Sequence, residues 1–489
     1  MTPNPSDTVV VGSGAGGLTV AVGLARLGRR VALVEADQVG GDCTNVGCIP
    51  SKTLIEAARR VSGLPASDRA AAADQALAQA RRLRDAVRAH DERLLTDTPG
   101  IELVRGRARL VSAVRGRVEI DVRGRDGDVR RLQAGRVVLA TGSEPALPPV
   151  PGLEQAGAPT SHALTNATLF DLTSPPERLL VLGAGAIGCE MAFAFARLGS
   201  GVTLVEAEGR VLPAAEPDAS DVVRARLEAA GVQVLAGARM TGFDPPTGRA
   251  TLASGGSERE PPTSIDARRV LVAVGRRPAT TDLGLEDAGV ALGPRGHVRV
   301  DRGYRTSAPG VYAIGDLIGG AFTHVANAQG RRLVRRLALP LPLTPEGAHP
   351  SVAFTEPEVG QIGATLEELR QRWPPRLLSV HRVELTDTDR GGTMGVQDGF
   401  VQLVALRGTG RLLAATVVAP HASEMLPLLT DAQRRGTSLW RLSRLEVAYP
   451  ALTEAVQRAA DDFVFSSLPR LHREAGAYLR WRWAGQAPG

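Results

Sequence analysis

The stretch TVVVGSGAGGLTVAVGLARLGRRVALVEAD, residues 8–37, decides the expected fold. A short apolar run leads into G-x-G-x-x-G, a helical segment follows, and a second apolar run ends in Val-Glu. Glycines at this spacing allow a tight turn, the approach of a pyrophosphate to the backbone, and close packing of helix on strand. Glu35, at the end of the second run, would accept hydrogen bonds from a ribose diol. The stretch therefore predicts a Rossmann-like dinucleotide-binding unit.

The same pattern occurs a second time, as LLVLGAGAIGCEMAFAFARLGSGVTLVEAE at residues 179–208. Two copies predict two bound dinucleotides. Glu206 ends the second copy and favours NADH over NADPH, because a carboxylate repels a 2′-phosphate, although Arg210 lies nearby. The glycines assigned to the turn, the phosphate approach and the packing are Gly12, Gly14 and Gly17 in the first copy and Gly183, Gly185 and Gly188 in the second.

The composition indicates a folded globular chain with no nucleic-acid partner. Hydrophobic residues make up 43% and charged residues 22% of the 489 positions, which excludes wholesale disorder. The net charge is +6, but 52 acidic residues nearly match 58 basic ones, and arginine is spread along the chain. We therefore interpret the excess of arginine as a compositional bias rather than as a nucleic-acid or anionic surface.

The termini and the cysteine count predict a cytoplasmic protein. Three cysteines do not make a disulfide scaffold. The N-terminus lacks the basic segment of a signal peptide. The uncharged run at residues 8–25 is long enough to raise the question of a membrane span, but its glycines favour a strand, a turn and a helix instead.

A second stretch, GGDCTNVGCIPSKT at residues 40–53, predicts redox chemistry. Cys43 and Cys48 can close a small ring, and a helix N-terminus lowers the pKa of a thiol placed there. Lys52 is the only lysine among the 58 Lys and Arg residues, and it follows Cys48 by one helical turn. Its compact ammonium could stabilise a reduced, anionic electron carrier, with Glu190 as counter-ion. No second cysteine or histidine pair accompanies the two cysteines, which argues against zinc.

These motifs, with ATG at 140–142, GRRP at 275–278 and TSAPGVYAIGD at 306–316, resemble the class I pyridine nucleotide–disulfide oxidoreductases. That family includes dihydrolipoyl dehydrogenase, glutathione reductase and mercuric reductase. The resemblance covers about residues 8–465. It implies an α/β fold with two Rossmann-like dinucleotide-binding domains, for FAD and NAD, and a C-terminal α+β dimerisation domain of a homodimer. The implied boundaries are 1–150 and 280–345 for the FAD domain, 151–279 for the NAD domain, 346–465 for the interface domain, and 466–489 for a basic aromatic tail.

The resemblance also implies roles for individual residues. FAD would bind the first unit, with Glu35 on the adenosine ribose and Asp316 near the ribityl chain. Cys48 would face the flavin, and Cys43 would be the interchange thiol that meets the acceptor. Lys52 would lie beside the flavin N5, paired with Glu190. The remaining cofactor-binding candidates are Gly41, Ala108, Thr141, Gly142, Gly275 and His324, of which His324 could equally be a satisfied residue at a helix start.

The chain departs from the family pattern near its C-terminus. Family members that handle dithiols carry His-Pro-Thr-x-x-Glu, in which the histidine is the acid–base and the glutamate orients it. The matching segment here is LEVAYPALTEAVQRAADDF at 445–463, with Tyr449 in place of the histidine and Glu454 at the glutamate position. Tyrosine titrates near about 10 and histidine near neutrality, so efficient lipoamide or glutathione chemistry is not expected. Mercuric reductases also carry this tyrosine, but they end in a cysteine pair, whereas no cysteine follows Cys189 here.

The sequence therefore predicts an enzyme that passes electrons from NADH through FAD to Cys43–Cys48 and on to an unidentified acceptor. A small-molecule or small-protein disulfide is the leading acceptor. The alternatives are Hg(II) or another soft metal ion, a quinone, and a non-catalytic redox sensor. No resident metal site is predicted. Tyr478, Trp481 and Trp483 in the tail could touch an anionic membrane, but a short helix packed on the dimer or a frayed end is the favoured interpretation.

Overall fold

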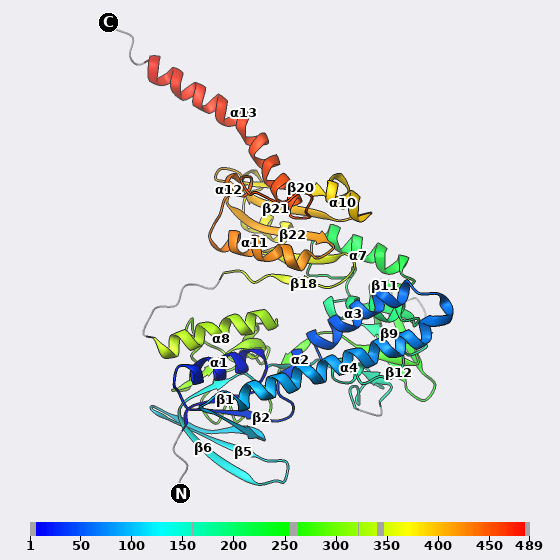
Figure 1. The fold of residues 1–489 in the computed structure, drawn as a ribbon, viewed down its shortest axis with the longest axis vertical. Helices are drawn as coiled ribbons and strands as arrows, with labels where there is room; N and C mark the ends of the chain where they lie inside the picture. Colours follow the sequence, from blue (N-terminus) through cyan, green and yellow to red (C-terminus); the bar gives the residue numbers. More distant parts are fainter. Residues whose placement is uncertain (1–5, 159–160, 255–262, 321, 340–346, 485–489) are drawn as a thin grey trace. The chain divides into compact units, whose positions relative to one another are not determined.

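The computed structural model describes residues 6–158, 161–254, 263–320, 322–339 and 347–484 (Figure 1). The chain forms two compact units. Unit 1 contains residues 1–207 and 230–345, and unit 2 contains residues 208–229 and 346–489. The predicted α/β fold is confirmed.

The first sheet of unit 1 has a parallel part and an antiparallel part. The parallel strands are β3 (Ile101–Arg105), β2 (Val31–Glu35), β1 (Ser6–Val11), β6 (Val129–Leu139) and β17 (Val311–Ala313). β4 (Arg107–Val114) and β5 (Arg117–Arg123) continue from β6 as an antiparallel meander. The central strands are almost wholly buried, which is typical of a sheet covered on both faces.

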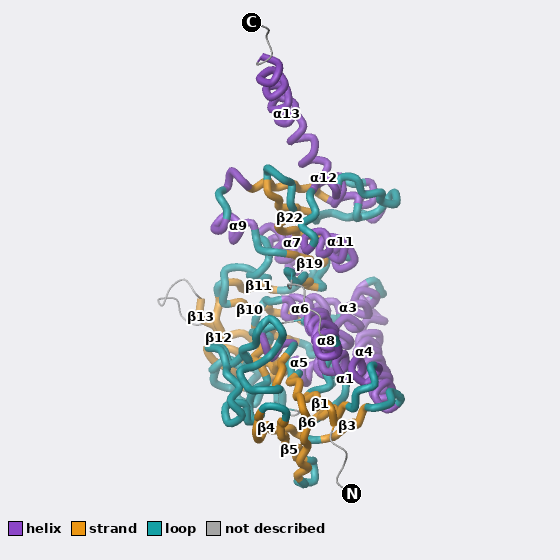
Figure 2. Tube along the Cα trace, turned by 90° about the vertical axis from the view of Figure 1, so that its left-hand side faces the viewer, coloured by secondary structure: helices purple, strands orange, loops and turns teal. Residues whose placement is uncertain are grey.

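Alternation along the central strands divides the core between the two faces of this sheet. Val10 and Leu33 pack in one cluster with residues of α1 (Ala15–Arg26) and α8 (Thr323–Ala338), two helices that lie side by side (Figures 1 and 2). Val9, Val11 and Ala32 pack in a second cluster with the meander. This is the period of two expected of strands. The helices that follow β2 are α2 (Gly41–Asn45), α3 (Cys48–Ser62) and α4 (Ala66–Thr96), and α3 packs along α4.

The second sheet of unit 1 repeats the design. Its parallel strands lie in the order β11 (Gln233–Ala236), β10 (Gly201–Glu206), β9 (Arg178–Leu182), β15 (Arg269–Val272) and β8 (Ala163–Leu164). α6 (Ala186–Arg197) follows β9, and α5 (Asn166–Leu169) follows β8. β12 (Ala238–Asp244), β13 (Arg249–Ser254) and β14 (Thr263–Asp266) form a separate antiparallel sheet. The short strands β7 (Ser143–Pro145) and β16 (Arg276–Pro278) pair where the chain enters and leaves this inserted segment.

Unit 2 is built on a five-stranded antiparallel sheet. The strand order is β18 (Ser351–Ala353), β19 (Glu358–Ile362), β22 (Leu412–Ala419), β21 (Phe400–Leu406) and β20 (Leu378–Glu384). The sheet buries Leu403, Val417 and Phe463 in one cluster with its helices. The helices of unit 2 are α7 (Pro217–Ala229), α9 (Leu366–Arg372), α10 (Asp389–Met394), α11 (Ala422–Arg434), α12 (Leu439–Leu442) and α13 (Glu454–Ala484).

Helix α7 joins unit 2 although it lies in the sequence between β10 and β11. Arg226 on α7 pairs with Asp398 at 2.6 Å, and the buried Glu216 accepts a hydrogen bond from the Leu366 backbone at 2.5 Å. The expected domain boundaries put these residues in the 151–279 segment. The sequence of a helix does not show on which unit the helix packs.

Helix α13 runs without a break through residue 466, where the sequence predicts that a tail begins. The side chains of Tyr478, Trp481 and Trp483 lie outside the described part of the structure. Among the described residues, no helix combines the length and the hydropathy of a membrane span.

Candidate active site

The two cysteines of the 40–53 stretch lie together, Cys43 on α2 and Cys48 at the start of α3. Both are half-buried and present as free thiols. A hydrogen bond from the Cys43 thiol lowers the pKa of Cys48 to about 6, assisted by the Thr323 hydroxyl and the Lys52 charge and opposed by burial. The same hydrogen bond and burial raise the pKa of Cys43 far above its usual value. Cys48 is therefore the thiolate of the pair, and Cys43 is the thiol that donates to it.

Two glycines let this loop lie directly on the first dinucleotide turn. Gly40 and Gly41 have φ of 99° and 60°, a region that disfavours other residues. A Cβ on Gly41 would lie 2.6 Å from the Cα of Gly14. The redox loop is thus held against the turn that would hold a pyrophosphate.

The side chains of α2 that flank Cys43 are each tied to a neighbour. Asp42 accepts a hydrogen bond from Arg276, and Thr44 donates to Asp91 at 3.1 Å. The Asn45 amide donates to two backbone carbonyls of the same loop, each at 2.9 Å. Cys43 is held by these contacts in a position to meet Cys48.

Lys52 and Glu190 form an ion pair at 2.8 Å. The Glu190 side chain is 4% exposed and the Lys52 side chain 33% exposed. Lys52 belongs to α3 and Glu190 to α6, so the pair joins a helix of the first dinucleotide-binding segment to a helix of the second. A buried carboxylate requires such a partner, and Lys52 supplies it one turn from Cys48.

The first dinucleotide turn has the predicted packing. Gly12 has φ of 97°, and a Cβ on Gly17 would lie 1.9 Å from the Gly12 carbonyl oxygen. The Glu35 carboxylate accepts hydrogen bonds from the Ser13 backbone at 2.8 Å and from its hydroxyl at 2.6 Å. The carboxylate is therefore fixed beside the turn, at the end of β2.

The second dinucleotide turn repeats this geometry. A Cβ on Gly188 would lie 1.8 Å from the Gly183 carbonyl oxygen, whereas a Cβ on Gly185 would have no atom within 4 Å. The Ala184 backbone donates to Glu206 at 2.6 Å, as the Ser13 backbone does to Glu35. The backbone at Gly185 therefore borders open space, as the motif requires for the approach of a pyrophosphate.

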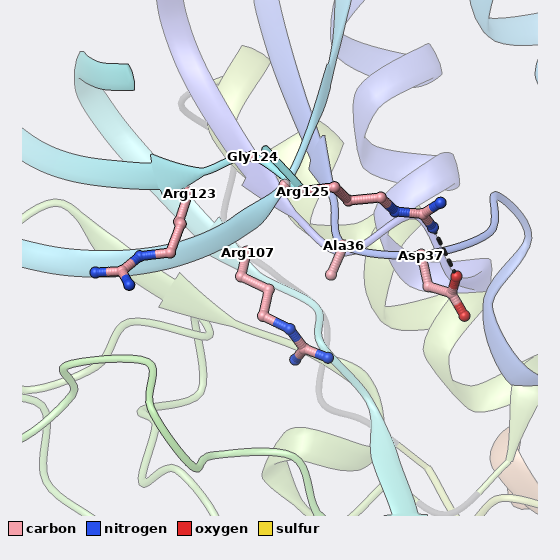
Figure 3. A pocket seen from close by; sticks show the side chains of 7 residues that line it. Ala36, Asp37, Arg107, Arg123, Gly124 and Arg125 are labelled. Carbon is pink, nitrogen blue, oxygen red and sulfur yellow. Dashed lines mark hydrogen bonds and ion pairs between the residues drawn. The ribbon is translucent and has the colours of Figure 1, made fainter. Parts of the chain in front are cut away.

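A cavity of about 410 Å³ begins directly after Glu35 (Figure 3). Arg125 reaches across it to Asp37, with a nitrogen–oxygen distance of 3.1 Å. Ala108, buried on β4, follows two of the lining residues in the sequence. The lining residues are Ala36, Asp37, Gly106, Arg107, Arg123, Gly124 and Arg125.

The remaining cofactor candidates lie at the junction of β7, β16 and the short helix η1 (Gly315–Ile318). Asp316 on η1 accepts a hydrogen bond from the Ser143 hydroxyl at 2.6 Å. Thr141 donates to the Ala279 carbonyl at 2.9 Å. Gly142 and Gly275 have φ of 73° and 123°, and a Cβ on either would have no atom within 4 Å.

At the start of α8, His324 stacks on Phe322, with ring centroids 5.3 Å apart. The preceding residue, Thr323, places its Oγ1 3.4 Å from the Cys48 sulfur. Sequence reasoning singled out the histidine and missed the threonine. The only available signal was its position beside His324.

Tyr449 and Glu454 each contact a different side chain. The Tyr449 side chain donates to Asp389 at 3.0 Å, and this hydrogen bond raises the pKa of Tyr449. Glu454 pairs with Arg458 at 2.9 Å, and its second oxygen is buried with no hydrogen-bond partner among the described residues. Asp389 was missed because it lies 60 positions away in the sequence.

Comparisons with known proteins agree with this geometry. Residues 6–331 match the model of the pyridine nucleotide-disulphide oxidoreductase family, and residues 349–460 match the dimerisation domain of that family. A dihydrolipoyl dehydrogenase from Chlorobaculum parvum is 34% identical, covering 93% of this chain and 96% of the relative. A mercuric reductase from Acidithiobacillus ferrooxidans is 34% identical, covering 93% of this chain and 82% of the relative.

Solved structures extend the likeness to the whole fold. The Cu(II) complex of the HOCl-induced flavoprotein disulfide reductase RclA from Escherichia coli superposes with a TM-score of 0.83 and 26% identity, covering 94% of this chain and 99% of that structure. LpdA from Mycobacterium tuberculosis gives a TM-score of 0.82 and 27% identity, with coverage of 93% and 99%.

Proposed function

Because this chain belongs to the class I pyridine nucleotide–disulfide oxidoreductase family, we propose that it passes two electrons from NADH to the Cys43–Cys48 pair and on to a disulfide acceptor. The chain is an FAD-dependent oxidoreductase that uses a pyridine nucleotide. The observation that carries the proposal is the thiol pair itself, in which Cys43 donates to Cys48 and holds the pKa of Cys48 near 6.

The residues of unit 1 fit FAD at the first turn. Gly14 and Gly41 carry no side chains, so a pyrophosphate could approach their backbone, and the Glu35 carboxylate at the end of β2 could bind a ribose. The adenine attached to that ribose would enter the cavity between Asp37 and Arg107. Asp316 would bind the ribityl chain. When bound, the flavin supplies two-electron transfer between a nicotinamide and a dithiol.

NADH fits the second turn better than NADPH does. The open space over Gly185 accepts the pyrophosphate, and Glu206 offers a carboxylate where NADPH would carry a phosphate. Arg210, the nearby cation that could favour NADPH, donates to the Pro213 carbonyl at 3.1 Å within its own loop. This contact supports the preference for NADH.

The chain's own residues manage charge and protons around the sulfurs. Lys52, oriented by Glu190, stabilises negative charge beside Cys48. Thr323 donates to the Cys48 thiolate. Reduction of the disulfide to the Cys43 thiol and the Cys48 thiolate takes two electrons and one proton. The family resemblance assigns the attack on an acceptor disulfide to Cys43, and the proton that Cys43 donates to Cys48 must leave before Cys43 becomes a nucleophilic thiolate.

A thiophilic metal ion, Hg(II) or Cu(II), is the second candidate acceptor. The observation that favours a metal ion is Tyr449, which occupies the sequence position where a dithiol enzyme carries its base. The hydrogen bond to Asp389 raises the pKa of Tyr449 further. A metal ion bound by two thiolates needs no such base. One relative is named a mercuric reductase, and one neighbour is a Cu(II) complex. We further propose that the protein is a homodimer through residues 349–460, as the family match supports, and that it works in the cytoplasm.

The deciding experiment is an anaerobic titration of the purified yellow protein with NADH, followed by visible absorption. Two electrons per flavin should produce the long-wavelength band of a thiolate beside oxidised flavin, and Cys48→Ser should abolish that band. If the flavin simply bleaches in the wild type, the pair does not receive electrons and the proposal fails in favour of direct transfer to a quinone. If the band forms, parallel assays with lipoamide, Hg(II) and Cu(II) identify the acceptor class.

A further inference from the structure

Arg276 lies at the centre of a hydrogen-bond network that reaches the redox loop, residues 40–48. Its guanidinium donates to the Asp42 carboxylate, at the start of this loop. It also donates to the Ser143 hydroxyl at 2.8 Å and to the Ser143 carbonyl at 2.7 Å. The Ser143 hydroxyl in turn donates to Asp316. One side chain thus connects the redox loop to strand β7 and to the expected ribityl-binding carboxylate.

The same arginine reaches the other side of the redox loop through Asn166. Arg276 Nη1 lies 3.4 Å from Asn166 Oδ1, and the Asn166 amide donates to the Val46 carbonyl at 3.2 Å. Asp42 precedes Cys43, and Val46 lies between Cys43 and Cys48. Arg276 on strand β16 is therefore connected to the loop on both sides of Cys43, directly at Asp42 and through Asn166 at Val46.

We propose that Arg276 is a positioning residue of the redox centre, which holds the loop in the one conformation where the Cys43 and Cys48 sulfurs face each other. This inference rests on the proposed function, because it concerns the same two sulfurs. Arg276 itself touches neither of them. It acts through Asp42 and Asn166.

The physical reason is the strict geometry of a disulfide. The bond forms only when two Cα atoms lie within about 4.4 to 6.8 Å with their Cβ atoms turned inward. A loop held in that geometry raises the effective concentration of one thiol at the other and so stabilises the disulfide over the dithiol. The ladder between β7 and β16 fixes the backbone of Arg276. A planar guanidinium with five donors can serve Asp42, Ser143 and Asn166 together, which a lysine cannot.

The neighbouring residue provides a matched control. Arg277 belongs to the same short strand and pairs with Glu144 at 3.1 Å, but its side chain is 65% exposed. Surface pairs of this kind contribute little. Arg277→Gln therefore removes an arginine from β16 without touching the network around Asp42.

The test is the exchange equilibrium of the cysteine pair with dithiothreitol. Reduced dithiothreitol gives two electrons and one proton to the protein disulfide, releases its second proton to solvent, and becomes its own cyclic disulfide. The fraction of protein dithiol is read from alkylation and mass in flavin-loaded wild type, Arg276→Gln, Arg276→Lys and Arg277→Gln. We expect Arg276→Gln to shift the equilibrium about tenfold toward the dithiol, Arg276→Lys to recover part of the shift, and Arg277→Gln to match the wild type.

A second readout reports the contact between the sulfurs. The alkylation rate of Cys48 should rise with a midpoint near pH 6 in the wild type, and the midpoint should lie higher in Arg276→Gln, because the donor Cys43 is displaced. If Arg276→Gln and Arg277→Gln give wild-type values in both measurements, the proposal is overturned. If Arg276→Gln does not fold, Asp42→Asn and Asn166→Ala are measured instead, and wild-type behaviour of both overturns it equally. A wild-type protein that forms no disulfide at all would instead contradict the proposed function.

Discussion

Groups from three helices of unit 1 stabilise the Cys48 thiolate by hydrogen bonds and positive charge. The Cys43 thiol of α2 contributes most, the Thr323 hydroxyl at the start of α8 comes next, and the Lys52 ammonium of α3 adds a charge. Burial opposes all three, because it disfavours a thiolate. The donors prevail, so that in the reduced protein Cys48 is ionised above about pH 6 while Cys43 keeps its proton.

The first prediction concerns Thr323. Thr323→Val removes a hydroxyl that donates to the thiolate and keeps the side-chain volume, so the pKa of Cys48 should rise by about one unit. The sign follows from the role of the hydroxyl, because losing a donor to the charged form makes the thiolate harder to form. The long-wavelength band of the reduced protein should then disappear at a higher pH than the midpoint near 6 expected for the wild type. Thr323→Ser is the control and should keep the wild-type midpoint, and an equal midpoint in Thr323→Val would rule out this role.

The second prediction concerns Tyr449. The Asp389 carboxylate accepts a hydrogen bond from the Tyr449 hydroxyl and raises the pKa of Tyr449. This phenol is therefore not a base near neutral pH. Tyr449→His introduces an imidazole five residues before Glu454, the first residue of α13, and the buried oxygen of Glu454 has no partner among the described residues. We expect turnover of lipoamide to rise about a hundredfold, which is the low end for a positioned acid–base. Tyr449→Phe controls for loss of the hydroxyl alone, and equal turnover by the two variants would count against the idea.

At the scale of elements, the two strand–turn–helix segments share the same glycine packing and differ in what lies next to the middle glycine. In both, the third glycine of the motif packs on the carbonyl of the first, at distances that leave no room for a Cβ. The middle glycine differs, because Gly185 borders open space and Gly14 borders Gly41. A side chain at the middle glycine of the second turn would therefore meet open space, whereas Gly41 lies against the middle glycine of the first turn.

The third prediction separates packing from binding in the second turn. Gly185→Ala puts a methyl group into open space at an extended φ of −69°, so the fold and the flavin content should not change. The same methyl group lies in the way of a pyrophosphate, so the KM for NADH should rise about tenfold or more with kcat nearly unchanged. Gly188→Ala is the contrast, because its Cβ would lie 1.8 Å from a carbonyl oxygen and must displace α6. A normal KM in a well-folded Gly185→Ala protein would argue that NADH does not bind there.

At the scale of the whole molecule, a buried ion pair joins the two dinucleotide-binding segments of unit 1. Lys52 on α3 and Glu190 on α6 lie 138 positions apart in the sequence and meet at 2.8 Å. Their exposures differ, because Glu190 is nearly inaccessible and a third of Lys52 reaches solvent. Removing one partner is therefore not equivalent to removing the other.

The fourth prediction follows from that asymmetry. Lys52→Met leaves a buried carboxylate without its cation and should lower the free energy of unfolding by roughly 3 kcal/mol, the low end for buried pairs, because solvent screens part of Lys52. Glu190→Gln keeps a hydrogen-bond acceptor for Lys52, whose ammonium still reaches water, and should lower it by about 1 kcal/mol. Denaturant unfolding of both flavin-loaded variants measures the difference. Equal losses would mean that the pair is solvated more evenly than the structure indicates.

The sequence by itself determined what rests on local chemistry. The two G-x-G-x-x-G turns were predictable because a strand, a glycine turn and a helix follow one another directly along the chain. The first glycine of the first turn has the positive φ, 97°, that such a turn needs. The cysteine spacing and the single lysine were predictable for the same reason. The family follows from these motifs, and the family matches over residues 6–331 and 349–460 confirm it.

Only the tertiary structure decided which distant side chains meet. Thr323 contacts Cys48 although the two residues are 275 positions apart in the sequence. Arg276 donates to Asp42 over a separation of 234 positions. Tyr449 donates to Asp389, which is 60 positions away, and not to Glu454. Helix α7 packs in unit 2, although the sequence places it between two strands of unit 1. No local pattern encodes such contacts, because each depends on where the folded backbone brings two segments together. The sequence singled out the two sulfurs that we expect to react, and the fold brings together the groups that set their charge and position.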